Sequence, residues 1–148
     1  LESMQLGSNL RMSEVSAAIG TVQLSNLDSW VKRRREIAEI YHQAFANHAF
    51  VSTPKVRPGA NHAWHQYCLA TEYPDELVTH LDQQGIDARR YYVTPCHRQN
   101  VFAAHPQHDE VLPVTATLSS SLVAIPVMHE LRDDEIERII SAIVSFDN

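Results

Sequence analysis

Apolar residues recur every three or four positions along the first third of the chain, which predicts a long helix. The positions that carry this pattern are Val15, Ala18, Ile19, Val22, Trp30, Val31, Ile37, Ala38, Tyr41 and Phe45. Ser13 precedes the first of them and is a favoured N-cap residue, so we expect the helix to span 13–46. Polar residues from Ser25 to Ser29 interrupt the pattern, which predicts a kink there.

The length of this helix matters for what it contacts. A straight helix over 13–46 would be about 50 Å long, whereas a compact domain of this size is only about 38 Å across. We therefore expect the helix to bend or to project beyond its domain. Its apolar face should be larger than the rest of the chain can cover, which predicts self-association as a homodimer. The residues of this face are Val15, Ile19, Val22, Trp30 and Val31.

Shorter patterns in the rest of the chain predict a small sheet and several helices. Strands are expected over 64–71, 86–93 and 122–127. Helices are expected over 74–84, 113–121 and 133–146, with a short helix or turn at 99–104 and a loop at 51–61. The predicted fold is α+β, with a long kinked N-terminal helix followed by a small, mostly antiparallel sheet of about three strands covered by helices on one face.

The composition and charge of the chain indicate a globular protein and disfavour some kinds of partner. The chain has 148 residues, of which 44% are hydrophobic and 20% charged, and these values fit one globular domain. A net charge of −6 argues against nucleic acid or a membrane as partner. Two cysteines are too few for a secreted disulfide framework, so we expect a cytoplasmic protein. Met4 is either a native start preceded by an expression scar or an internal residue of a longer chain.

Nine histidines raise the possibility of a metal site. Two pairs lie three residues apart, His62 with His65 and His105 with His108. No cysteine pair or HExxH motif accompanies them, so surface histidines are the favoured interpretation and a metal site the alternative. Cys96 and His97 are adjacent and would point to opposite faces of an extended segment, which disfavours a catalytic dyad.

Basic residues offer little catalytic chemistry on their own. The run from Lys32 to Arg35 is interpreted as a solvated helix face, with phosphate binding as the alternative. The chain has only two lysines, Lys32 and Lys55. One lies in a charged helical stretch and the other in a proline-rich loop, and neither position suits a desolvated nucleophile.

Several segments resemble a known enzyme family. The most specific is Asn9-Leu10-Arg11-Met12-Ser13-Glu14. It is followed, in the family's order, by His62-Ala63-Trp64-His65-Gln66-Tyr67, Arg89-Arg90-Tyr91-Tyr92, Pro95-Cys96-His97 and Ile125-Pro126-Val127. Over about residues 7–146 the chain resembles the C-terminal part of the DegT/DnrJ/EryC1/StrS aminotransferases, which use pyridoxal 5'-phosphate (PLP) and act on nucleotide-linked keto sugars.

The resemblance implies a division of the chain and a set of site residues. It implies an N-terminal extension over 1–12 that contacts phosphate, a connecting helix over 13–46 and a small domain over 47–148. Family members are dimers, and the residue matching Asn9 reaches the PLP phosphate of the neighbouring subunit. The family lines its nucleotide-sugar site at the positions that match Arg89, Arg90, Tyr91, Tyr92 and His97.

We therefore expect the C-terminal domain of an enzyme of amino-sugar and polysaccharide biosynthesis. The family's PLP-bearing lysine lies in a large domain without counterpart here, so this chain alone is expected to bind no cofactor, to supply no catalytic residue and to be inactive. The alternative is a stand-alone dimerisation or sugar-nucleotide-binding module. Three residue-level alternatives stay open: a turn-capping Asn9, a loop histidine at His97 and a core position for Tyr91 or Tyr92.

Overall fold

Helix α1 (Glu14–Phe45) is the longest element of the computed structural model, which describes residues 11–147. It begins where the sequence predicts, because the Ser13 side chain accepts a hydrogen bond from the Ser16 backbone N–H at 3.1 Å. This cap satisfies one of the N–H groups that a helix leaves free in its first turn.

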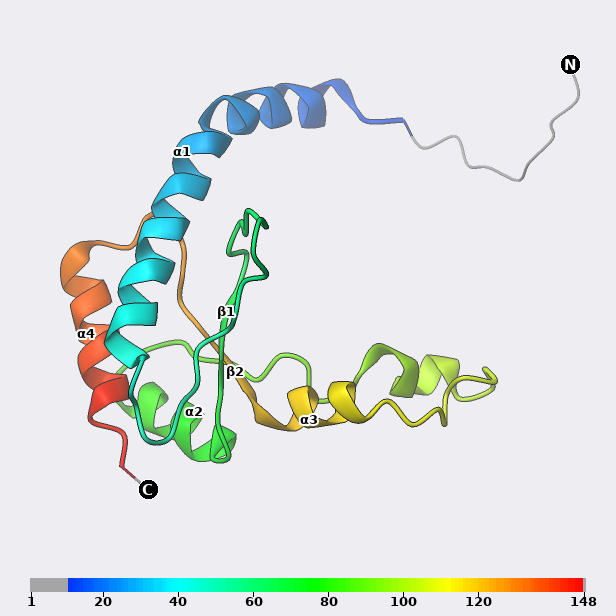
Figure 1. Cartoon of the computed structure of the whole chain (residues 1–148). Coiled ribbons are helices and arrows are strands. Elements are labelled where there is room, and N and C mark those ends of the chain that lie inside the picture. The colour runs from blue at the N-terminus through cyan, green and yellow to red at the C-terminus, as the bar shows by residue number, and fades with distance from the viewer. Residues whose placement is uncertain (1–10, 148) are drawn as a thin grey trace, which may run out of the picture.

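Figure 1 shows that α1 bends along its length. Polar side chains at the predicted interruption bind carbonyl groups one turn back. Ser25 Oγ and Asn26 Nδ2 both donate to the Val22 carbonyl, at 2.7 and 2.9 Å, and Ser29 Oγ donates to the Asn26 carbonyl at 2.7 Å. Such back-bonding competes with the helical hydrogen bonds and is a known cause of bending.

The sheet is smaller than predicted and has two antiparallel strands, β1 (Tyr67–Ala70) and β2 (Leu122–Ile125). The third strand expected over 86–93 is wrong. Only Arg89 pairs with β2, through two backbone hydrogen bonds to Ala124 at 3.0 and 2.7 Å. Tyr92 and Val93 have strong β-propensity but are exposed here, so they lack the packing that stabilises a strand.

The remaining helices agree with the sequence expectations to within two residues. They are α2 (Pro74–Gln83), α3 (Pro113–Ser121) and α4 (Asp133–Val144). The short 3-10 helix η2 (Asn100–Phe102) lies in the region predicted as a helix or turn, and a second one, η1 (Cys96–Arg98), precedes that region and was not predicted. Gly85 follows α2 with φ of +69°, a conformation that glycine adopts without strain. No helix within residues 11–147 is long and apolar enough to cross a bilayer.

The core forms where the second half of α1, α2 and α4 meet the sheet (Figure 1). Its fully buried large side chains are Ile37, Tyr41, Phe45, Tyr67, Leu69, Leu77, Leu81, Val123 and Ile143. Tyr41 also donates to the Pro126 carbonyl at 2.9 Å, which satisfies its hydroxyl inside the core. Helix α4 contributes Ile136, Ile139, Ala142 and Ile143 to this core, whereas its last residue, Val144, is exposed.

Two parts of the chain lie outside this core. Residues 14–29 of α1 are all exposed. No residue from 89 to 122 is buried, and Figure 1 shows the segment around η1, η2 and α3 extending away from the body of the fold. We refer to residues 91–121 as the arm. Neither part contributes a buried side chain to the hydrophobic core.

Candidate functional site

The structure divides the predicted site residues between two hollows. Arg89 and Tyr91 line the first, whereas Arg90 and His97 line the second. Consecutive side chains of an extended segment point to opposite sides, so Arg89 and Tyr91 share one side and Arg90 points to the other. The structure therefore separates the two arginines that the sequence places next to each other.

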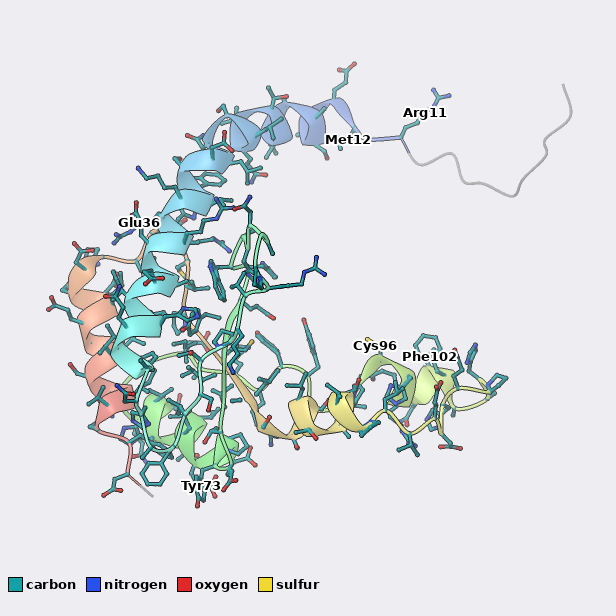
Figure 2. The ribbon with its side chains drawn as sticks, viewed as in Figure 1. Arg11, Met12, Glu36, Tyr73, Cys96 and Phe102 are labelled. Atoms are coloured by element: carbon teal, nitrogen blue, oxygen red, sulfur yellow. The ribbon has the colours of Figure 1, made fainter. Side chains whose placement is uncertain are left out.

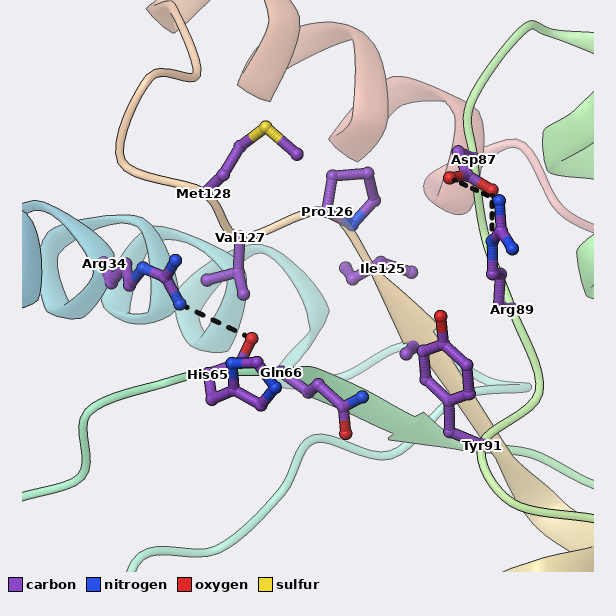
Figure 3. A pocket seen from close by; sticks show the side chains of 11 residues that line it. Arg34, His65, Gln66, Asp87, Arg89, Tyr91, Ile125, Pro126, Val127 and Met128 are labelled. Atoms are coloured by element: carbon purple, nitrogen blue, oxygen red, sulfur yellow. Dashed lines mark hydrogen bonds and ion pairs between the residues drawn. The ribbon is translucent and has the colours of Figure 1, made fainter. Parts of the chain in front are cut away.

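The first hollow has a volume of about 350 Å³ and lies beside β2, between α1 and the segment that carries Arg89 (Figure 3). Its floor is apolar and comes from the end of β2 and the residues after it, Ala124, Ile125, Pro126, Val127 and Met128. Its rim is polar and consists of Arg34, His65, Gln66, Asp87, Arg89 and Tyr91. An apolar floor with a few convergent polar groups is typical of a small-molecule site.

Two guanidinium groups and one carboxylate set the charge of this rim. Arg89 Nε and Nη2 donate to the two Asp87 oxygens at 2.9 and 3.2 Å, and this hydrogen-bonded pairing raises the pKa of Arg89 above its ordinary value. Arg34 Nη1 donates to the carbonyls of Trp64 and His65 at 3.1 and 3.5 Å. Two cations against one anion favour a ligand with negative charge.

The second hollow, of about 360 Å³, lies within the arm, which supplies all of its lining residues except Arg90. Arg90 lines this hollow, but both of its terminal nitrogens already donate hydrogen bonds to other parts of the chain. Nη1 donates to both carboxylate oxygens of Asp75 at 2.9 and 3.1 Å, and Nη2 donates to the Ser120 carbonyl at 2.9 Å. His97 is half-buried between this hollow and a smaller one of about 200 Å³ that Cys96 and Phe102 also line. Figure 2 shows Cys96 and Phe102 on the arm, away from the body of the fold.

Tyr92 lines neither of these two hollows. Tyr92 is 67% exposed, and its ring centre lies 5.2 Å from that of Tyr91. The expectation that one of these two tyrosines packs in the core is wrong, since neither is buried. The cause is the turn at this point, which replaces the strand that would have directed alternate side chains inward. Asn9 lies outside the described residues.

The basic run on α1 differs from the sequence interpretation as a solvated face. Arg33 donates to the Leu131 carbonyl at 3.1 Å and pairs with Asp133 at 2.6 Å. Arg35 donates to the His62 carbonyl at 2.9 Å, and Arg34 takes part in the first hollow. Sequence reasoning named Arg34 only within the basic run, with phosphate binding as the alternative, and it missed the floor from Ile125 to Met128. Only the folded chain brings these residues beside Arg89.

The described residues do not fit PLP. A cofactor of this kind is held on a lysine, and both Lys32 and Lys55 are exposed and line none of the hollows described above. Several histidines also have structural roles. His48 and His80 each place Nε2 within 2.9 Å of a carbonyl of α4, those of Ile143 and Ala142. Within residues 11–147, no group of three or more His, Cys, Asp or Glu side chains is arranged to hold a metal ion.

Comparison with known proteins gives a consistent assignment. Residues 1–144 match the DegT/DnrJ/EryC1/StrS aminotransferase family. The chain is 31% identical over 137 residues to dTDP-3-amino-3,4,6-trideoxy-alpha-D-glucose transaminase of Streptomyces venezuelae, covering 93% of this chain and 36% of that protein. It is 33% identical over 143 residues to a pleiotropic regulatory protein of Geobacillus stearothermophilus, covering 95% of this chain and 38% of that protein.

A solved structure shares the fold. S. venezuelae DesV, in complex with a ketimine intermediate, superposes with a TM-score of 0.89 at 28% identity. The match covers 98% of this chain and 40% of DesV. The chain thus spans well under half the length of the proteins it matches, and nearly all of it takes part in the match.

Proposed function

The chain belongs to the DegT/DnrJ/EryC1/StrS aminotransferase family, and on that premise we propose that it is the C-terminal part of a PLP-dependent enzyme that transfers an amino group to a nucleotide-linked keto sugar. The observation that carries this proposal is the family match, which extends over residues 1–144. The S. venezuelae transaminase supports the sugar substrate, because its name specifies a dTDP-linked amino sugar. In such an enzyme PLP supplies the amino-transfer chemistry, and the protein binds and orients the reactants.

The chain alone is proposed to be inactive. The two exposed lysines, Lys32 and Lys55, are poor candidates for the covalent link, since neither lies in a hollow where burial or a neighbouring group would activate the amine. The chain spans 36% of the S. venezuelae transaminase, so the lysine that holds PLP would come from the remainder of such an enzyme. We assign Asn9 to the cofactor phosphate of a neighbouring subunit.

The first hollow is the proposed binding surface for the nucleotide sugar. Arg89 has a side chain that is 62% exposed at the rim, where a guanidinium suits a phosphate oxygen. The apolar floor beside it suits a ring, and Tyr91 lines the same hollow. Tyr92 and His97 line no part of the first hollow, so we keep them as contacts of the same substrate on the family resemblance alone, with His97 near the sugar.

The proposed division of the chain is an N-terminal extension over 1–12, a connecting helix over 13–46 and a small domain over 47–148. The second candidate function is a stand-alone dimerisation or sugar-nucleotide-binding module. It is favoured by the exposed apolar side chains Val15, Ile19 and Val22 on α1, which offer a surface for a second copy. In both candidate functions the first hollow would bind the sugar nucleotide and α1 would contact a second copy of the chain.

Titration of the chain with dTDP, followed by NMR, tests the proposed substrate surface. We expect saturable shifts for the amides of Arg89, Tyr91 and Val127, with α4 unaffected. Replacing Arg89 with alanine should weaken binding about 10-fold, because a charge-assisted hydrogen bond is lost. Arg132→Ala is the matched control, since Arg132 pairs with Asp134 in a similar geometry away from the hollow. Absence of shifts, or equal effects of the two substitutions, would reject the assignment.

A further inference from the structure

The arm has few attachments to the body of the fold. None of its residues is buried, and the side-chain hydrogen bonds that its residues donate stay within the arm. At its C-terminal end, the Ser121 carbonyl accepts a hydrogen bond from the Thr71 backbone N–H of the body at 3.0 Å. Arg98 pairs with Asp109 at 3.0 Å, and Gln99 Nε2 donates to the Thr94 carbonyl at 3.0 Å. An arm without a hydrophobic anchor needs another means of holding a fixed direction, because exposed segments with few buried contacts open readily.

Arg90 lies at the base of this arm, where three parts of the chain meet. It directly precedes the first residue of the arm, while Ser119 and Ser120 are near its last. Nη2 of Arg90 donates to the carbonyls of both serines, at 3.4 and 2.9 Å, and Nη1 donates to both oxygens of Asp75 in the first turn of α2. One guanidinium therefore joins the two ends of the arm to each other and to the body.

The surroundings of Arg90 leave little of it for a ligand. Its side chain is only 19% exposed, compared with 62% for Arg89. Its Nε is buried and has no hydrogen-bond partner among the described residues. A planar guanidinium with donors fixed in a fork can serve a carboxylate and two carbonyls at once, whereas a lysine ammonium is a single flexible point charge.

We propose that Arg90 is a positioning residue that fixes the arm to α2, and that it does not bind the substrate diphosphate. Arg89 is then the only one of the two adjacent arginines that is available to an anion. The consequence for the site is that Arg90 acts through His97, which the arm carries. The role of His97 in the site rests on the proposed function. The attachment of the arm to α2 by Arg90 does not, because it is a property of the fold.

Pulsed electron paramagnetic resonance on the folded chain tests the attachment without nucleotide or cofactor. One spin label is placed on Cys96 in the arm and the other on Glu137→Cys in α4, in a background where Cys68 is replaced by alanine. We expect a single narrow distance in this reference protein and in its Arg89→Ala version, which is the matched control. Arg90→Ala should lose the single distance and give a broad distribution, and Arg90→Lys should fail to restore it.

Asp75→Asn gives a second and milder test, because it removes the ion pair and leaves the carbonyl contacts of Arg90 in place. We expect a distribution between those of the reference and Arg90→Ala. If Arg90→Ala does not fold, as judged by circular dichroism, Asp75→Asn decides the question. A narrow, unchanged distance in a folded Arg90→Ala protein, or in Asp75→Asn when the former does not fold, would overturn the proposal. Equal broadening in Arg89→Ala would overturn it as well.

Discussion

At the scale of single residues, arginine side chains connect segments that are distant in sequence. Arg33, Arg34, Arg35 and Arg90 each donate to a backbone carbonyl at least 27 positions away. A carbonyl in an irregular segment has no partner in a helix or sheet, so a charged donor satisfies it and fixes the segment. Arg34 and Arg35 therefore connect α1 to the loop that precedes β1, and Arg33 connects α1 to the segment that precedes α4.

Replacement of Arg34 with alanine tests this role. The substitution leaves the Trp64 carbonyl without its charged donor, so we expect the free energy of unfolding to fall by about 1–3 kcal/mol. Lys32→Ala is the control on the same helix and should change it by less than about 0.5 kcal/mol, since Lys32 is exposed. Urea unfolding at neutral pH measures both values. Similar losses for the two variants would contradict the role assigned to Arg34.

The two cysteines should differ in reactivity for a physical reason. Burial raises the pKa of the Cys68 thiol, so less of its reactive thiolate is present at pH 8, whereas Cys96 is exposed. We expect a thiol reagent at pH 8 to modify Cys96 first and Cys68 in a slower phase, with peptide mass spectrometry to identify each site. In denaturant the two rates should converge. Equal rates in the folded protein would contradict the burial of Cys68.

At the scale of the elements, the two halves of α1 have different surroundings. The second half supplies Ile37, Tyr41 and Phe45 to the core. In the first half, Val15, Ile19 and Val22 are 71%, 55% and 65% exposed, and their spacing places them on one helix face. The sequence prediction of an uncovered face is confirmed for these three. It is wrong for Trp30 and Val31, which are both half-buried; Trp30 stacks on His129 with ring centres 4.5 Å apart.

Self-association through this face remains a prediction, and Ile19→Glu tests it. A carboxylate in place of an interface isoleucine should raise the dimer dissociation constant about 100-fold or more. Ala17→Glu, on the opposite side of the helix, is the control and should leave association unchanged. Sedimentation velocity over a range of micromolar concentrations measures both. A wild-type chain that stays monomeric throughout would contradict the prediction.

Helices were more predictable than strands in this chain. Helix α4 has isoleucines at helical spacing and three acidic residues in its first turn, where Glu135 accepts the Arg132 backbone N–H at 2.9 Å. These are local signals that sequence spacing carries directly. The false strand over 86–93 had the right residue types, but whether a segment forms a strand depends on a partner and on packing that local sequence does not specify.

At the scale of the whole molecule, the candidate site assembles from parts that are distant along the chain. The first hollow joins Arg34 of α1, Gln66 before β1, Arg89 and the residues after β2. Family resemblance indicated Arg89 and Tyr91, because they belong to a recognisable motif. It gave no indication that Arg90 is engaged by Asp75 on α2 and by the Ser120 carbonyl, since both partners are distant from it in sequence.

The central claim is that this chain is part of a PLP-dependent aminotransferase and does not carry the lysine that holds the cofactor. The most direct measurement is to incubate the pure chain with PLP, reduce with borohydride and map the modified peptides. We predict that neither Lys32 nor Lys55 is labelled stoichiometrically, because both side chains are exposed and outside the hollows described here. A single lysine labelled at one equivalent per chain would contradict this claim.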